Sequence, residues 1–169
     1  MLLILASASR SRGQGVESAE RVTAAFVAGS PQFVEWPTEV LEGRDELEIC
    51  VWEPDPFDET LEELLRMEVL DGRPLRERRI NRPSMIDGCH VLYVPSITRR
   101  IRSLLSVTEG RPVLTIGEAP DFLERGGIVR LQVVERRIRF EVNADAAARA
   151  GLRLSSDFLS LAADVRGEP

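Results

Sequence analysis

Residues 47–67 read LEICVWEPDPFDETLEELLRM and place a strand directly before a helix. The first seven residues alternate between apolar and mixed side chains, with the period of two that is typical of a strand. Asp55 is suited to cap the helix that follows, and Pro56 suits its first position. Apolar side chains then recur at helical spacing, at Phe57, Leu61, Leu64 and Leu65.

Two more buried strands follow, at residues 89–95 (CHVLYVP) and 113–116 within RPVLTIGE. Between them, Ser96 is suited to cap a helix over ITRRIRSLL, with inner positions at Ile97, Ile101, Leu104 and Leu105. Buried strands that are joined through helices form mainly parallel sheets.

The period changes at residues 127–143, GIVRLQVVERRIRFEVN. Apolar residues alternate with polar ones on both sides of a turn, which predicts an antiparallel hairpin with one solvated face at the edge of the sheet. Asn143 is suited to cap the next helix, ADAAARA, which Gly151 ends, and Ser155 or Ser156 can open the last one.

We therefore predict one compact α/β domain of three-layer type over residues 16–169, after a flexible segment at residues 1–15. Its core sheet is mainly parallel, with an antiparallel C-terminal hairpin and flanking helices. Residues 29–31 (Gly-Ser-Pro) interrupt the opening helix, and we expect a kink or break there because proline removes a helical hydrogen bond.

The composition fits a folded domain: 169 residues, 43% hydrophobic and 30% charged. A formal charge of -6 argues against extensive nucleic-acid binding. Residues 39–71 hold 13 acidic and 2 basic side chains, whereas residues 73–111 hold 9 basic and 3 acidic ones. Two solvated faces would explain this asymmetry, as would a bipolar surface that orients a partner.

The N-terminus reads MLLILASAS, in which Ala6-Ser7-Ala8 matches the small-residue pattern of a signal-peptidase site. A complete signal peptide would also have a positively charged start and a longer apolar run, and both are missing here. We therefore interpret residues 1–15 as a flexible remnant of a signal peptide. An ordinary frayed terminus is the alternative. The two cysteines, Cys50 and Cys89, would form a disulfide in an exported chain and be buried thiols in a cytosolic one.

The sequence lacks the residue sets that catalytic sites and metal sites usually contain. His90 is the one histidine of the chain, and Cys89 beside it should point to the opposite face of a strand. Cys50 can lie near His90 if the two strands pair, but no third group would orient that pair. Two cysteines and one histidine do not make a usual metal site, and phosphate-binding glycine motifs are missing. We predict a protein that is not an enzyme and holds no metal or cofactor.

The stretch QFVEWP, residues 32–37, brings Phe33 and Trp36 together in a chain with 5% aromatic residues. We interpret it as a packing corner, in which Trp36 covers the edge of the core and Pro37 starts an extended segment. The alternative is that Phe33 and Trp36 line a small apolar pocket or a partner surface.

Residues 111–162 carry, in order, VLTIGE, FLERGGI, a hairpin ending in RFEVN, then AARAGLRLSS and FLSLA. This order resembles the YfiR/HmsC-like family of bacterial periplasmic regulators. The similarity reaches upstream to VTAAFVAGSPQFVEWP (residues 22–37) and covers about residues 22–165.

The resemblance implies regulation. Such a protein is a soluble periplasmic homodimer that binds the periplasmic domain of a membrane-bound diguanylate cyclase and represses it. Repression lowers cyclic-di-GMP and restrains biofilm formation. The fold does not fix the partner, which could be another membrane sensor. The alternative is a periplasmic small-molecule-binding module that feeds a sensor kinase or a transporter, and a cytosolic α/β enzyme is a weaker third interpretation.

The resemblance also implies a disulfide between Cys50 and Cys89, because family members carry a bridge at matching positions. The chain departs from the family in three ways. The opening helix is interrupted at residues 29–31, the segment DFLERGGIVRL lacks the second cysteine pair that members can carry, and the signal peptide looks truncated.

For the partner or ligand surface we favour the hairpin and the segment after it. Phe140, Glu141 and Asn143 lie at the end of the predicted hairpin. Arg149 and Arg153 flank the helix end and could meet an anionic group of a partner. The alternative for both arginines is a solvated helix face.

Overall fold

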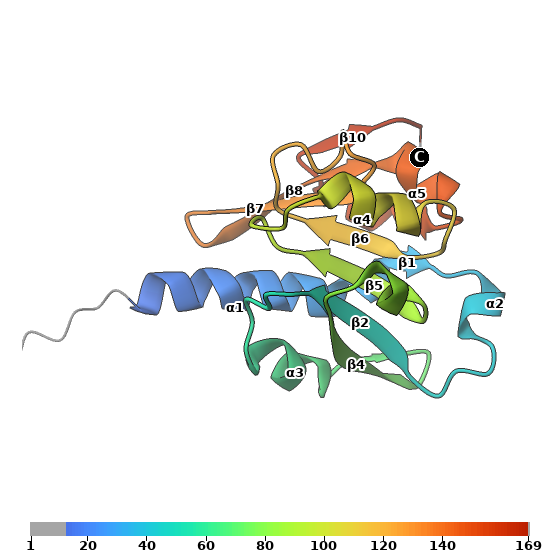
Figure 1. The fold of residues 1–169 in the computed structure, drawn as a ribbon, viewed down its shortest axis with the longest axis horizontal. Helices are drawn as coiled ribbons and strands as arrows, with labels where there is room; N and C mark the ends of the chain where they lie inside the picture. The colour runs from blue at the N-terminus through green and yellow to red at the C-terminus, as the bar shows by residue number, and fades with distance from the viewer. Residues whose placement is uncertain (1–12, 169) are drawn as a thin grey trace, which may run out of the picture.

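The computed structural model describes residues 13–168 (Figure 1). Its helices are α1 (Gly13–Gly29), η1 (Ser30–Phe33), α2 (Thr38–Leu41), α3 (Thr60–Leu65), η2 (Pro83–Ile86), α4 (Ile101–Thr108), α5 (Ala144–Arg149) and α6 (Ser156–Leu161). Its strands are β1 (Val34–Glu35), β2 (Leu47–Trp52), β3 (Val69–Leu70), β4 (Arg73–Ile80), β5 (Cys89–Val94), β6 (Leu114–Gly117), β7 (Val129–Val134), β8 (Arg137–Asn143), β9 (Arg153–Leu154) and β10 (Asp164–Arg166).

The main sheet has the strand order β10-β8-β7-β6-β5-β2-β4-β3. Strands β4, β2, β5, β6 and β7 pair in parallel, which confirms the mainly parallel core sheet. Strands β7 and β8 form the antiparallel hairpin that the alternation predicted. The hairpin is not the edge of the sheet, however, because β10 pairs in parallel with the outer side of β8.

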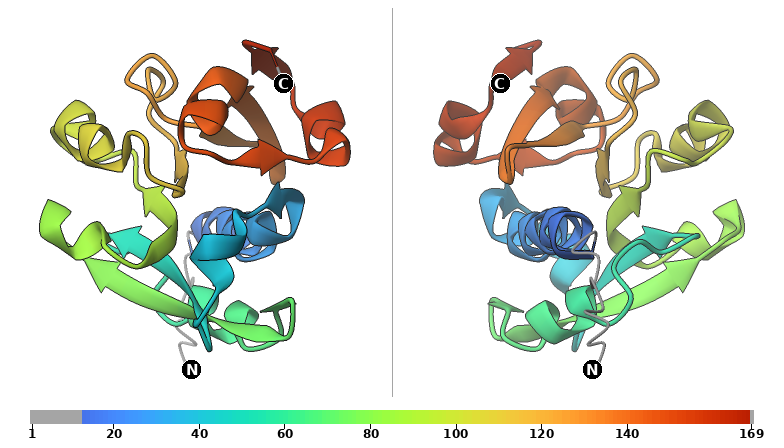
Figure 2. Two further views of the ribbon diagram at one scale, coloured as in Figure 1. Left: turned by 90° about the vertical axis from the view of Figure 1, so that its right-hand side faces the viewer. Right: turned by 90° about the vertical axis from the view of Figure 1, so that its left-hand side faces the viewer.

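Helices cover both faces of the sheet and give it three layers. One apolar core lies between the sheet and α1, α3, α5 and α6. The second lies on the opposite face, beneath α4 and η2. Figure 2 shows α1 and α4 on opposite sides of the strands. The predicted α/β class and the flanking helices are thus observed, built on the buried side chains of the parallel strands.

The pairing of β2 with β5 contains a bulge. Glu48 aligns with Cys89 but Ile49 aligns with Val91, so His90 is an extra residue on β5. An extra residue reverses the alternation of the strand locally. Cys89 therefore lies with Cys50 in the core beneath α4, whereas Val91 belongs to the core on the other face.

Two predicted helix starts are wrong. The helix after β2 begins at Thr60, because Asp55 accepts the backbone N–H of Phe57 at 2.8 Å in a turn and Asp58 has a φ of 51°. The helix after β5 begins at Ile101, because Arg100 adopts a left-handed conformation with a φ of 60°. Ile97, expected on its inner face, is 68% exposed.

The opening helix breaks where the sequence predicted it. Helix α1 ends at Gly29, and η1 continues the chain in tighter turns with Pro31 at its start. Helix α1 begins at Gly13, inside the segment 1–15 that we expected to be flexible. The signal-peptidase pattern at residues 6–8 lies outside the described residues.

Both predicted C-terminal caps are present. Asn143 Oδ1 accepts the backbone N–H of Ala146 at 2.9 Å at the start of α5. Ser155, the first of the two candidates, accepts the N–H of Phe158 at 3.2 Å and opens α6. Gly151 follows α5 with a φ of 71°, a conformation that favours glycine.

Candidate functional site

Four phenylalanines, Phe26, Phe33, Phe140 and Phe158, join the opening segment to the hairpin and to α6. Ring centroids lie 4.6 Å apart for Phe140 and Phe158, and 5.3 Å apart for Phe33 and Phe158. Phe26 lies 5.2 Å from Phe140. Phe140 is buried and Phe33 is half-buried, so both site candidates hold elements together.

Trp36 is fixed by a different set of contacts. Its indole Nε1 donates to the carbonyl oxygen of Pro31 at 3.1 Å, and its ring lies 5.9 Å from the ring of His90 in an edge-on arrangement. Phe33 contacts Phe158, on a different element. Each aromatic side chain of the QFVEWP corner thus has its own packing partner, as the packing interpretation requires.

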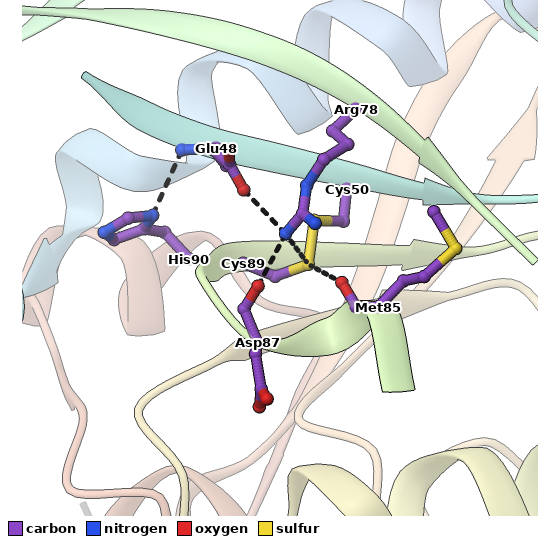
Figure 3. Close-up of polar contacts among 7 residues, drawn as sticks. All are labelled: Glu48, Cys50, Arg78, Met85, Asp87, Cys89 and His90. Carbon is purple, nitrogen blue, oxygen red and sulfur yellow. Dashed lines mark hydrogen bonds and ion pairs between the residues drawn. A yellow bond between two sulfur atoms is a disulfide. The ribbon is translucent and has the colours of Figure 1, made fainter. Parts of the chain in front are cut away.

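His90 is buried and accepts a hydrogen bond on Nδ1 from the backbone N–H of Glu48, at 3.1 Å (Figure 3). Burial lowers the pKa of His90 below its usual 6.5, and the positive charge of Arg44 lowers it further, whereas a hydrogen bond to the backbone of Val40 acts in the opposite direction. His90 is therefore neutral near pH 7. Both cysteines are joined in a disulfide and offer His90 no thiol to activate.

The disulfide links Cys50 of β2 to Cys89 of β5, with Cα atoms 5.7 Å apart. Arg78 of β4 closes over it, as Figure 3 shows. Its Nη2 lies 2.6 Å from Glu48 Oε2 and donates to the carbonyl oxygen of Asp87 at 2.8 Å. Three neighbouring strands are thereby connected by covalent, ionic and hydrogen bonds at one point.

The acidic and basic segments of the sequence neutralise each other in space. The acidic segment contains β2 and the basic segment contains β4, and these strands pair in parallel. Across the paired strands, Glu46 forms an ion pair with Arg76 and Glu48 forms one with Arg78, each offset by two residues from the strand register. Arg79 Nε lies 2.8 Å from Asp55 Oδ2 and 3.1 Å from Glu77 Oε1. This part of the charge asymmetry stabilises the sheet.

Glu141, a candidate on the hairpin, is engaged within the protein. Its Oε1 lies 2.8 Å from Arg130 Nη1, and its Oε2 lies 3.8 Å from Arg166 Nη2. Glu141 projects from the face of β8 opposite Phe140, and it lines a polar cavity of about 250 Å³ with Arg130 and Arg139. Asn143 is likewise occupied, as the cap of α5.

Arg149 and Arg153 are both exposed. Arg149 lines a cleft of about 260 Å³ together with Arg102 and Arg125, between α4, the loop before β7, and α5. Arg153 Nη1 lies 3.5 Å from Glu35 Oε2, across the pairing of β1 with β9. The seven candidates thus fall in separate places: an aromatic cluster, a Trp36 corner, a polar hairpin face and two exposed arginines.

A groove of about 350 Å³ lies beside Arg153. Its walls are mainly small or apolar residues of α5, β9 and α6: Ala144, Ala147, Ala148, Gly151, Leu152, Leu154 and Leu159. Leu161, near its end on α6, is 68% exposed. We call this groove, together with Arg153, Leu161 and Arg149 on the neighbouring face of α5, the C-terminal surface. It combines an apolar floor with charged residues at the rim, among them Arg153 and Glu168.

Sequence reasoning missed a larger cavity, of about 570 Å³, at the carboxyl ends of β5 and β6. Its lining includes Tyr93 and Ser96 from the end of β5, Glu118 from the end of β6, and Glu20 from α1. Ligands of α/β proteins often bind at the carboxyl ends of parallel strands. The polar residues at the ends of two predicted parallel strands, in YVPS and TIGE, could have indicated this cavity from the sequence.

Within residues 13–168, no group of three or more His, Cys, Asp or Glu side chains is arranged to hold a metal ion. No helix in the same range is long and apolar enough to cross a membrane.

A family model described as YfiR/HmsC-like matches residues 20–163. Among solved structures, the chain is similar to the ABC domain in complex with L-Trp from Streptococcus pneumoniae, with 12% identity and a TM-score of 0.51 over 88% of this chain. A conserved domain protein from Vibrio cholerae matches 76% of the chain with 15% identity and a TM-score of 0.47. The matches span 60% and 57% of those longer chains. At such low identity the first likeness concerns the fold alone.

Proposed function

Because the chain belongs to the YfiR/HmsC-like family, whose model matches residues 20–163, we propose that it is a periplasmic regulator of a membrane-bound diguanylate cyclase. It binds the periplasmic domain of the cyclase and represses it, which lowers cyclic-di-GMP and restrains biofilm formation. The family match carries this proposal, since it covers most of the chain.

The disulfide supports a periplasmic location. Disulfides persist in oxidising compartments, including the bacterial periplasm, and are rare in the cytosol. Cys50 and Cys89 are joined between the central strands β2 and β5, where the bond crosslinks the core of the domain.

We assign the cyclase contact to the C-terminal surface. Of the residues expected there from the sequence, Arg149 and Arg153 are exposed, whereas Glu141 and Asn143 are engaged in internal contacts. Buried apolar area supplies most of the affinity of protein interfaces, and charged rims supply orientation. The apolar groove and the adjacent arginines offer both. The proposal also includes a homodimer of two copies of this chain. Light scattering of the purified protein would measure the mass of that dimer.

The test is the intracellular concentration of cyclic-di-GMP in the native bacterium. Deletion of the gene should raise it, and an exported copy of the protein should restore it. Exported copies that carry Arg149→Glu or Arg153→Glu should fail to restore it, because each reverses a charge at the proposed contact. Arg136→Glu, at the exposed hairpin turn, is the matched control and should restore it fully.

The outcomes test cyclase control and the assignment of the contact to the C-terminal surface separately. If deletion leaves cyclic-di-GMP unchanged, cyclase control is rejected. If deletion raises it but both arginine variants restore it as well as the control, the cyclase contacts another surface. A stoichiometric complex of the purified protein with the periplasmic domain of the cyclase should accompany the first result.

A further inference from the structure

The proposed function leaves the cavity at the carboxyl ends of β5 and β6 unused. Its volume of about 570 Å³ falls in the range of small-molecule sites. The walls come from α1, the loop before α3, the ends of β5 and β6, and β7. In Figure 1 the first half of α1 and the hairpin tip lie at the same end of the molecule.

The charged side chains that line this cavity are all acidic. Glu20 of α1 and Glu118 after β6 contribute two carboxylates. None of the 22 arginines of the chain is among its lining residues. Asp55 lies close enough that its charge, like those of Glu118 and Glu20, acts on the phenol of Tyr93. The cavity thus carries a negative potential that favours a cation.

Two buried hydroxyl groups also line the cavity. Tyr93 is 1% exposed and Thr23 is 3% exposed. The phenol of Tyr93 lies beside the carboxylate of Glu118, whose charge and hydrogen bonding both act on it. Burial, and then the charge of Glu118, raise the pKa of Tyr93 far above its usual 10, so it remains a phenol that can donate or accept. The two hydroxyls give a ligand polar groups to pair with next to Glu118.

The remaining walls are apolar. Phe57 and Tyr93 pack with ring centroids 4.7 Å apart, and Leu131 and Val133 of β7 contribute aliphatic side chains. At the rim, Val134 is 47% exposed, and Ile97, next to the lining residue Ser96, is 68% exposed. An aromatic and aliphatic wall beside two carboxylates suits a molecule with an apolar body and one positive charge.

We propose that this cavity is a binding site for a small organic cation, a primary amine with an apolar or aromatic body. Its ammonium group lies against Glu118 and Glu20, within reach of the hydroxyls of Tyr93 and Thr23, and its body lies against Phe57 and Leu131. The site does not depend on cyclase control. It is formed by α1 and the ends of β5 and β6, whereas the C-terminal surface is formed by α5, β9 and α6.

The test uses phenethylamine, tryptamine and cadaverine as probes of the full chain, with 3-phenylpropionate as the anion of matched size. Titration calorimetry and ligand-detected NMR measure the affinity. At least one amine should bind saturably with a Kd of about 1 mM or tighter, and phenylpropionate should not. Glu118→Gln should weaken that amine about tenfold because it removes a charge-assisted hydrogen bond, and Tyr93→Phe roughly fivefold.

Glu63→Gln is the matched control. Glu63 is exposed on α3, and its replacement removes one negative charge, as Glu118→Gln does. It should leave the affinity unchanged. The proposal is overturned if none of the three amines binds, if phenylpropionate binds as tightly, or if Glu118→Gln and Glu63→Gln have equal effects. None of these results bears on the cyclic-di-GMP measurement.

Discussion

Cys50 and Cys89, 39 residues apart in the sequence, join β2 to β5 with their Cα atoms 5.7 Å apart. The bulge at His90 brings the two side chains to the same face of the sheet. In a regular strand that kept His90 without a bulge, Cys89 would share the face of Val91 and could not reach Cys50. The bulge and the disulfide are therefore a single structural feature.

Removing the disulfide should lower the free energy of unfolding substantially. In the chain-entropy model, a crosslink that closes a loop of this length contributes about 4 kcal/mol. We expect the variant Cys50→Ala/Cys89→Ala to lose about that amount in urea unfolding at neutral pH. Wild type kept in a reducing agent should behave like the variant. Equal midpoints for oxidised and reduced wild type would contradict the expectation, as would alkylation of both thiols without prior reduction.

The ion pair of Glu48 with Arg78 should contribute more than an exposed pair. Their side chains are 29% and 31% exposed, and Arg78 also donates to the carbonyl oxygen of Asp87. A double-mutant cycle with Glu48→Gln and Arg78→Met should give a coupling free energy of about 1 kcal/mol.

The pair of Glu62 with Arg66 on α3 is the matched control. These side chains are 56% and 67% exposed. Solvent screens such a pair, and its cycle should give a coupling of only about 0.3 kcal/mol. Equal couplings in the two cycles would show that the position over the disulfide adds nothing.

His90 should make the protein less stable as the pH falls. Its pKa in the folded state is lowered from 6.5, chiefly by burial, so the unfolded chain takes up a proton at a higher pH than the folded chain does. Stability must therefore fall as the pH drops below about 6.5, until the folded state is protonated as well. Urea unfolding at pH 7.5 and at pH 5.5 measures the effect.

His90→Asn separates this contribution from those of other groups. The asparagine side-chain oxygen can accept the backbone N–H of Glu48, the hydrogen bond that His90 accepts at Nδ1, but the amide does not titrate. The difference between the variant and the wild type should shrink on acidification from pH 7.5 to pH 5.5. A difference that is constant over this range would contradict the assignment.

Gly127 should not tolerate a side chain. An added Cβ would overlap with the ring of Phe122 and approach its carbonyl oxygen to 2.8 Å. Phe122 is fully buried in the core beneath α4 and cannot move away freely. We expect Gly127→Ala to lower the free energy of unfolding by about 2 kcal/mol or more, as overpacking does.

Gly29→Ala is the control for that substitution. A Cβ at Gly29 would meet nothing within 4 Å, and the residue ends α1 with an ordinary negative φ of -80°. Alanine there should be neutral or stabilising by up to about 1 kcal/mol, because it restricts the unfolded chain. If both alanine variants are equally stable, the overlap of a Cβ at Gly127 with Phe122 does not destabilise the protein.

The strands and their order of connection could be predicted from local patterns. Apolar runs at residues 47–53, 89–95 and 113–116 become parallel strands, and the alternation after residue 127 becomes a hairpin. The caps at Asn143 and Ser155 were also predictable, because a cap needs only the residues next to it. The starts of α3 and α4 were not, since Asp58 and Arg100 adopt positive φ angles that no local preference required.

The candidate sites were harder to predict. Phe140 and Glu141 are neighbours in the sequence, yet they lie on opposite faces of β8, one in the aromatic cluster and one paired with Arg130. The acidic cavity has lining residues from α1, β5, β6 and β7. A site of this kind has no contiguous motif, because each element contributes one or two side chains.

The sequence by itself determined the α/β class, the hairpin, the break after Gly29 and the resemblance to a family of regulators, since each depends on periodicity or on neighbouring residues. Only the tertiary structure decided which strands adjoin, and with that the neutralisation of the acidic segment by the basic one. It also decided that β10 would cover β8 and that a bulge at His90 would bring Cys89 to Cys50. These outcomes depend on strand register and on contacts between distant segments, which local side-chain patterns do not encode.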